Sequence, residues 1–391
     1  MARWRGRHVL LGVALVAYFF TLFARLVISP VVPDIIETYG VSKSEIGLAL
    51  TAMWAAFALI QYPGGILGDR YGEKPVILGA ILVTGFAGLL VAIAPTYAAF
   101  VVVVVLLGIG AGLYPPSGTS LLAKRFRRTG QALGLHVAGA NLAGLVAPVA
   151  AAYVAVRYGW RAAPLLVVAL TVPVFVLFAT GVRPTTPSRP DVPMRERFTV
   201  GALSAILSRR TILFTTLIGI IGQFTFGAVA SFLPTFLIEF WGLGTEHAGA
   251  VFGVVYLFSA MTMPLTGRLS DIVGRDLAIA VSLSLATAGL ALLLFGRGTL
   301  PAIAAVVVLG TGISWGGTVH SRFMDHLADA ERGTGFGLVR TVTGLVGSTG
   351  SVVVGALADF SGWTAAWGVV ITLLVLAVLL LGSNRVLRLG L

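Results

Sequence analysis

Two arginines lie inside long apolar stretches of the 391-residue sequence. Arg25 is spaced at i, i+4 and i+8 with Thr21 and Ser29, so the three would share one helix face. Arg340 begins a second stripe of small and polar residues. Guanidinium groups stay charged and bind carboxylates and phosphates through several donors. Each arginine therefore faces either a structural partner, such as a carbonyl or carboxylate, or an anionic ligand.

Four further side chains with polar atoms fall within apolar runs, and they are His136, Gln223, Tyr114 and Trp315. Each is a candidate for lining a binding site, and each could equally be a packing residue. His136 is also a candidate for proton binding, because histidine titrates near neutral pH. Asp34 and Glu37 are the alternative titratable groups, and the sequence does not choose among the three. A coupling ion, H⁺ or Na⁺, stays unassigned.

The acidic residues add to this expectation by their positions. All fifteen carboxylates lie in polar breaks or near the ends of apolar runs, and none is at mid-depth beside Arg25 or Arg340. A cationic site of this kind suits a small anion, organic or inorganic, as the solute. With no cysteine and five scattered histidines, the sequence predicts neither a metal site nor a cofactor.

The elements that carry these residues are predicted from composition. Hydrophobic residues make up 57% of the chain and charged residues 11%, with a mean hydropathy of +0.97. A bilayer core needs about 20 apolar residues per helix. The sequence predicts an all-α polytopic protein of the lipid bilayer with twelve transmembrane helices, whose cores are residues 9–29, 45–67, 75–95, 98–122, 131–156, 162–182, 212–236, 247–268, 277–295, 300–320, 335–357 and 363–382.

The net charge of +12 is explained by orientation. With both termini in the cytoplasm, 21 of the 27 lysines and arginines fall in cytoplasmic loops and four fall outside. This asymmetry follows the rule that basic loops stay inside. The charge therefore indicates membrane topology, and no nucleic-acid partner is expected.

The chain is expected to divide into two six-helix halves. A proline-containing cytoplasmic linker at 183–210 separates a half at 1–182 from a half at 211–391. Glycines recur at matching positions, since Gly108 and Gly310 are 202 residues apart and Gly159 and Gly362 are 203 apart. The order of elements is the same in both halves, which predicts parallel repeats about an axis along the membrane normal.

A loop motif occurs once in each half. The first copy comprises Gly65, Asp69, Arg70, Gly72 and Lys74, and the second retains Gly267, Asp271, Gly274 and Arg275. Through these residues the chain resembles, over its whole length, the prokaryotic-type major facilitator superfamily. The resemblance implies a conformational latch at Asp69 and Asp271. A charged turn that fixes topology is the simpler alternative. Glycine at 65 and 267 would allow close approach of helices.

The resemblance implies a monomeric secondary transporter of the cytoplasmic membrane, working by alternating access on a small solute. Its cavity-lining helices would include the one that carries Arg25. The alternative is proton-coupled efflux of hydrophobic compounds, although the fifth-span motif of drug antiporters is incomplete at Ala147 and Pro148. A transporter-like receptor is a remote alternative. A membrane enzyme is equally remote, and no enzymatic activity is expected. The sequence offers one candidate cluster for such a site, formed by His320, Asp325 and His326.

Overall fold

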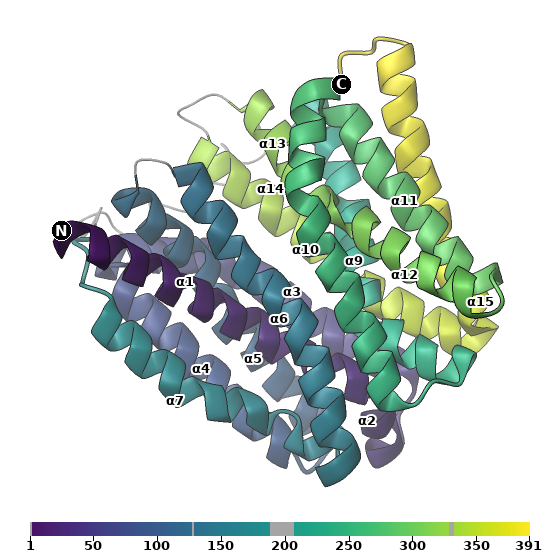
Figure 1. Cartoon of the computed structure of the whole chain (residues 1–391), viewed down its shortest axis with the longest axis horizontal. Coiled ribbons are helices and arrows are strands. Elements are labelled where there is room, and N and C mark those ends of the chain that lie inside the picture. Colours follow the sequence, from purple (N-terminus) through teal and green to yellow (C-terminus); the bar gives the residue numbers. More distant parts are fainter. Residues whose placement is uncertain (1, 127–128, 188–206, 328–331) are drawn as a thin grey trace. The chain divides into compact units, whose positions relative to one another are not determined.

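The computed structural model describes residues 2–126, 129–187, 207–327 and 332–391. Most of the predicted linker at 183–210, and Arg127 and Arg128 of a basic cluster, lie outside these ranges. The described chain forms helices joined by short turns (Figure 1) and divides into two compact units. Unit 1 comprises residues 1–41, 52–198 and 244–249, and unit 2 comprises residues 42–51, 199–243 and 250–391.

Unit 1 is built from the helices of the first half of the chain. They are α1 (Ala2–Leu26), the short 3₁₀ helix η1 (Ser29–Val31), α2 (Val32–Tyr39), α3 (Lys43–Tyr71), α4 (Glu73–Ile93), α5 (Tyr97–Arg125), α6 (Thr129–Tyr158), η2 (Trp160–Ala162) and α7 (Leu165–Gly181). The first nine residues of α3 belong to unit 2. Helix α1 packs against α6, and α4 packs against α5 and α7.

Unit 2 contains the remaining helices. They are α9 (Arg210–Trp241), α10 (Thr245–Val273), α11 (Arg275–Phe295), α12 (Thr299–Gly312), η4 (Ile313–Trp315), α13 (Gly316–His326), α14 (Arg332–Gly347) and α15 (Gly350–Val386). Helix α11 packs against α12 and α15, and α9 packs against α14 and α15. These pairings parallel those of α4 and α1 in unit 1.

Two pairs of glycines turn the chain at matching places. Gly72 and Gly274 have φ values of +89° and +91° and precede α4 and α11. Gly159 and Gly362 have φ values of +81° and +79°, and Gly362 interrupts α15 with a non-helical backbone. Residues with a Cβ avoid this region of backbone space, so glycine is required at these turns.

Eleven helical segments of the described residues are long and apolar enough to cross a membrane. The last of them, Gly337–Val386, has 50 residues and contains Gly362. The predicted core 363–382 falls in this segment, and the predicted core 335–357 overlaps it from residue 337 on. The all-helical class is therefore confirmed, while the number twelve and the side of the termini remain predictions.

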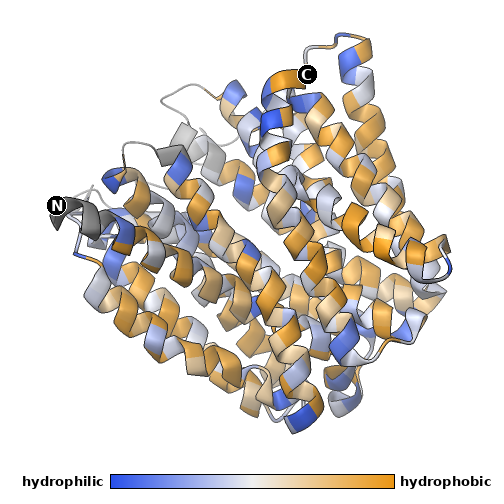
Figure 2. Cartoon of the chain, in the orientation of Figure 1, coloured by the Kyte–Doolittle hydropathy of each residue, from blue (hydrophilic) through white to orange (hydrophobic). Residues whose placement is uncertain are grey.

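Helix surfaces match a lipid environment. Apolar side chains remain exposed along several helices, including Val102 at 69%, Ile272 at 80% and Phe360 at 85%. Hydrophilic residues gather near helix ends (Figure 2). Because lipid tails solvate apolar groups, such side chains need not be buried inside the protein.

Close helix packing depends on other glycines than those predicted. A Cβ at Gly65 would make an ordinary 3.7 Å contact with Pro116, and among described atoms none lies within 4 Å of one at Gly267. The prediction that these two glycines allow close approach is therefore wrong for the packing seen here. Instead, Gly112 lies against Phe57 of α3, where a Cβ would be 2.6 Å from the carbonyl oxygen. Glycine at that position lets α5 pack against α3.

Candidate functional site

Arg25 is held by aromatic side chains. It lies in the last turn of α1 and is 4% exposed. Its guanidinium carbon is 3.8 Å from the ring centroid of Phe57 and 4.5 Å from that of Trp54, both on α3. Its Nε donates to the Thr21 carbonyl oxygen at 3.2 Å. The ring faces attract the cation but leave its positive charge in place.

The predicted stripe of three residues on one helix face is only partly correct. Thr21 and Arg25 lie on α1, but α1 ends at Leu26 and Ser29 begins η1. Pro30 has no N–H to continue the helical ladder, which favours a break here. The Thr21 hydroxyl donates to the Tyr18 carbonyl oxygen at 3.0 Å, within its own helix. Both Thr21 and Ser29 are buried.

His136 and Tyr114 lie together in unit 1. The His136 ring stacks on Tyr18 of α1 with centroids 4.5 Å apart, and it lies 5.6 Å from the Tyr114 ring of α5. The Tyr114 hydroxyl donates to the Ala14 carbonyl oxygen at 2.6 Å. Tyr114 is completely buried, so its polar atom serves helix packing.

The candidates of unit 2 occupy different surroundings. Trp315 is 6% exposed in η4, and its ring covers Gly222 of α9, where a Cβ would lie 2.6 Å away. Gln223 follows on α9 and lies against Gly347 of α14. Arg340 is partly buried on α14, close enough to His320 of α13 for an electrostatic interaction. Arg340 and His320 therefore lie near one another within unit 2.

In the first copy of the loop motif, the basic residues contact neighbouring groups, whereas the acidic residue does not in the described part of the chain. The Lys74 ammonium donates to the Ala179 carbonyl oxygen of α7 at 2.6 Å, and Arg70 stacks near Tyr71. Within the described residues, Asp69 forms neither a hydrogen bond nor an ion pair. Among the described residues, Lys124 of α5 pairs with a different carboxylate.

A neighbouring carboxylate, which the sequence analysis missed, takes that partner. The Glu73 side chain is fully buried at the start of α4, and its Oε1 lies 2.5 Å from the Lys124 Nζ of α5. Ser120 donates to the same oxygen at 2.8 Å, and the Thr185 hydroxyl donates to Oε2. Four polar side chains thus join α4, α5 and the segment after α7.

Unit 2 has a related cluster. Asp276, the second residue of α11, accepts from the Arg322 Nε at 2.6 Å and from the Asn384 amide at 2.7 Å. Arg322 is 3% exposed and also donates to the Leu391 carbonyl oxygen. An acidic residue at a helix start, just after the turn glycine, is the sequence signal that points to both clusters.

The second motif copy forms ion pairs that are more exposed than those of Glu73 and Asp276. Arg275 contacts Asp271 at 2.7 Å and Asp325 at 2.9 Å, and Asp271 is 70% exposed. Asp325 is thereby committed to an ion pair. In the described residues no group of three or more metal-ligating side chains occurs.

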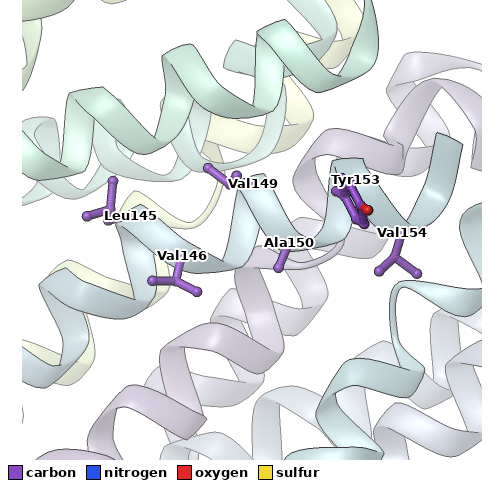
Figure 3. A pocket seen from close by; sticks show the side chains of 6 residues that line it. All are labelled: Leu145, Val146, Val149, Ala150, Tyr153 and Val154. Atoms are coloured by element: carbon purple, nitrogen blue, oxygen red, sulfur yellow. The ribbon is translucent and has the colours of Figure 1, made fainter. Parts of the chain in front are cut away.

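A hollow of about 440 Å³ lies along α6, apart from the candidate residues. Figure 3 shows its lining side chains, which all come from that helix and are Leu145, Val146, Val149, Ala150, Tyr153 and Val154. Its lining is almost entirely apolar, and Val146, Val149 and Tyr153 are exposed. An acyl chain fits this surface better than a polar solute does.

The described chain is a polytopic set of apolar helices with buried cationic side chains, an arrangement that transporters share. Residues 14–329 match the family model of the Major Facilitator Superfamily, and the chain belongs to this family. It is a multi-pass protein of the cytoplasmic membrane, and its relatives transport small solutes.

Three comparisons show which proteins the chain is similar to. The chain is 26% identical to the probable sulfoacetate transporter SauU of Cupriavidus necator, with 92% of this chain and 89% of the relative covered. It is 22% identical to the hexuronate transporter of Bacillus subtilis, with 65% and 62% covered. The crystal structure of a bacterial homolog of the human lysosomal transporter Spinster matches with a TM-score of 0.80 at 16% identity, covering 96% of each chain. That likeness concerns the fold.

Proposed function

We propose that the protein is a secondary active transporter that moves a small anion across the cytoplasmic membrane by alternating access. The carrying observation is Arg25, a permanent cation that is 4% exposed within the apolar segment His8–Tyr39. Burial of a charge is costly, and sites in membranes that bear one are commonly functional. The ring faces of Trp54 and Phe57 orient the guanidinium for a ligand.

Two relatives support an anionic solute. By name, one transports sulfoacetate and the other hexuronate, and both compounds carry an acidic group. An arginine binds such groups with two parallel hydrogen bonds, which a lysine cannot reproduce. Arg340 is a second candidate contact. Thr21, Ser29, Gln223, Tyr114 and Trp315 are proposed to shape the surroundings of the solute.

We propose twelve crossings with both termini in the cytoplasm and a monomeric carrier. Gly362 supports the count, since its non-helical backbone separates the last two predicted spans. In this topology the two loop motifs and the clusters of Glu73 and Asp276 lie at the cytoplasmic ends of the helices. A latch role for the motifs follows from the family resemblance.

A ligand screen tests the solute class. Purified protein is heated with sulfoacetate, glucuronate, inorganic phosphate, glucose or tetraphenylphosphonium, and the unfolding midpoint is measured. A ligand that binds the folded state at 100 times its Kd contributes about 2.7 kcal/mol, so a binder is readily detected. We expect sulfoacetate or glucuronate to stabilise the protein, and glucose to have no effect.

Variants of two arginines provide the matched comparison. Arg25→Gln removes the buried cation and should raise the Kd of the anion at least about tenfold, or about 1.4 kcal/mol. Arg157→Gln removes an exposed arginine that pairs with Glu246 and should change the Kd less than twofold. Stabilisation by tetraphenylphosphonium alone would instead favour efflux of hydrophobic cations. Equal anion affinity in wild type and Arg25→Gln would exclude the proposed contact.

A further inference from the structure

His136 is enclosed by aromatic rings at the contact of three helices. It lies on α6 and is 2% exposed. Its ring is nearly parallel to that of Tyr18, with 16° between the planes and 4.5 Å between centroids. Tyr114 of α5 closes a second side at 5.6 Å. A stacked ring in this position is fixed in orientation and shielded from water.

Both nitrogens of this buried ring lack a hydrogen-bond partner among the described residues. The Ala14 carbonyl oxygen, which accepts from the Tyr114 hydroxyl at 2.6 Å, also lies close to the ring. A single carbonyl can serve only one ring nitrogen, so at least one nitrogen is buried without an acceptor or donor among the described residues. A buried polar group without a partner is uncommon in folded proteins and calls for an explanation. Packing alone does not explain a histidine here, because a phenylalanine or leucine would fill the same space without burying an unpartnered polar atom.

The backbone holds the ring at this place. One helical turn after His136, a Cβ on Gly139 would overlap the Leu15 carbonyl oxygen of α1. Glycine therefore brings α6 directly onto α1, and the His136 ring has little freedom to move toward another partner.

The ionisable groups around the ring are few. From α1 the ring faces Tyr18, and from α5 it faces Tyr114. Helix η1 contains no ionisable residue, and on η2 Arg161 donates to the Ala92 and Ala94 carbonyl oxygens. Along α1, Arg25 is seven residues beyond Tyr18, or about 10 Å at 1.5 Å per residue. These contacts place no carboxylate against the ring.

We propose that His136 is the proton-binding group that couples movement of the anion to H⁺, an inference that rests on the proposed anion transport. A proton bound at the unprotonated ring nitrogen gives an imidazolium that stacks on the Tyr18 ring face, a favourable cation–π geometry. The imidazolium would be a second buried cation in unit 1, in addition to Arg25. An anion at Arg25 lowers the cost of this second charge, so the anion and the proton bind cooperatively.

Magnetic resonance of the full chain in nanodiscs measures the proton directly. Histidine rings are labelled with ¹⁵N, and the His136 signals are identified by their loss in His136→Gln. We expect the ring to gain a proton as the pH is lowered. With 50 mM sulfoacetate, its midpoint should rise by about one pH unit, a tenfold increase in proton affinity. A ring that stays neutral throughout, with and without the anion, would overturn the proposal.

Transport into liposomes measures the coupling. With the outside acidic, wild type should accumulate labelled sulfoacetate several-fold over equilibrium, and His136→Gln should only equilibrate it. His247→Gln, a variant of an exposed histidine at the start of α10, should accumulate it as wild type does. Accumulation by His136→Gln would overturn the proposal. Absence of sulfoacetate binding in the ligand screen would instead count against the anion, while the ring titration without ligand still reports on the proton site.

Discussion

The buried ion pair of Glu73 offers the sharpest test of how α4 and α5 are held together. Its two charged atoms are 2.5 Å apart, the Glu73 side chain is fully buried, and Lys124 is 33% exposed. Removing one partner of a fully buried pair costs about 3–5 kcal/mol. Exposed pairs contribute about 0–1 kcal/mol. With one partner buried and the other partly exposed, Glu73→Gln should destabilise unit 1 by about 2–3 kcal/mol.

Thermal unfolding of the purified protein, followed by tryptophan fluorescence, measures this loss. One kcal/mol shifts the Tm of a domain of 150–250 residues by about 2–4 °C. We therefore expect Glu73→Gln to lower the Tm by about 4–12 °C. Asp271→Asn removes a carboxylate that is 70% exposed and paired with Arg275, and it should lower the Tm by less than about 2 °C.

A double-mutant cycle separates the pair from other effects of the substitution. Lys124→Met keeps the aliphatic part of the side chain and removes the ammonium. If the ion pair is responsible, the loss in the double variant should be smaller than the sum of the two single losses by about 1–2 kcal/mol. Additive effects, or a Tm change below 1 °C for Glu73→Gln, would refute the reasoning.

Two further predictions concern Asp276 in unit 2 and the backbone at Gly362, and the same thermal unfolding assay measures both. Asp276→Asn removes the carboxylate that Arg322 contacts at 2.6 Å, and it should destabilise unit 2 by at least about 2 kcal/mol; a loss equal to that of Asp271→Asn would contradict this. Gly362→Ala should cost about 1–2 kcal/mol through its positive φ alone, since no described atom lies within 4 Å of the added Cβ. Gly79→Ala, at an open helical position, is its control and should be neutral or slightly stabilising.

The helices could be predicted because the length of an apolar run is a local property of the sequence. The predicted core 75–95 corresponds to α4 at Glu73–Ile93, and 277–295 corresponds to α11 at Arg275–Phe295. The last two predicted spans share the segment Gly337–Val386, because Gly362 turns the chain without leaving residues outside the helical hydrogen-bond pattern. Boundaries at such a turn are visible only in the backbone.

The contacts of the candidate residues could be predicted less well, because they depend on which helices meet. The sequence predicts that Arg25 is a charge within the membrane-spanning region, but its aromatic partners Trp54 and Phe57 come from α3. Their spacing of three residues places both rings on one helix face, although nothing in the sequence says that this face meets Arg25. Likewise, the stacking of His136 on Tyr18 requires the close contact of α6 with α1.

The carboxylates after the turn glycines show why a motif can direct attention to the wrong residue. The repeat aligns Asp69 with Asp271, whereas Glu73 aligns with Arg275 at the same offset. Even so, Glu73 and Asp276 both start a helix and both pair with a buried or partly buried cation. The favourable interaction of a negative charge with a helix start holds at either the first or the second position. Lys124 completes the pair with Glu73, and Arg322 completes the pair with Asp276. Each half therefore has a paired carboxylate at the start of a corresponding helix, although the two acidic residues do not align in the repeat.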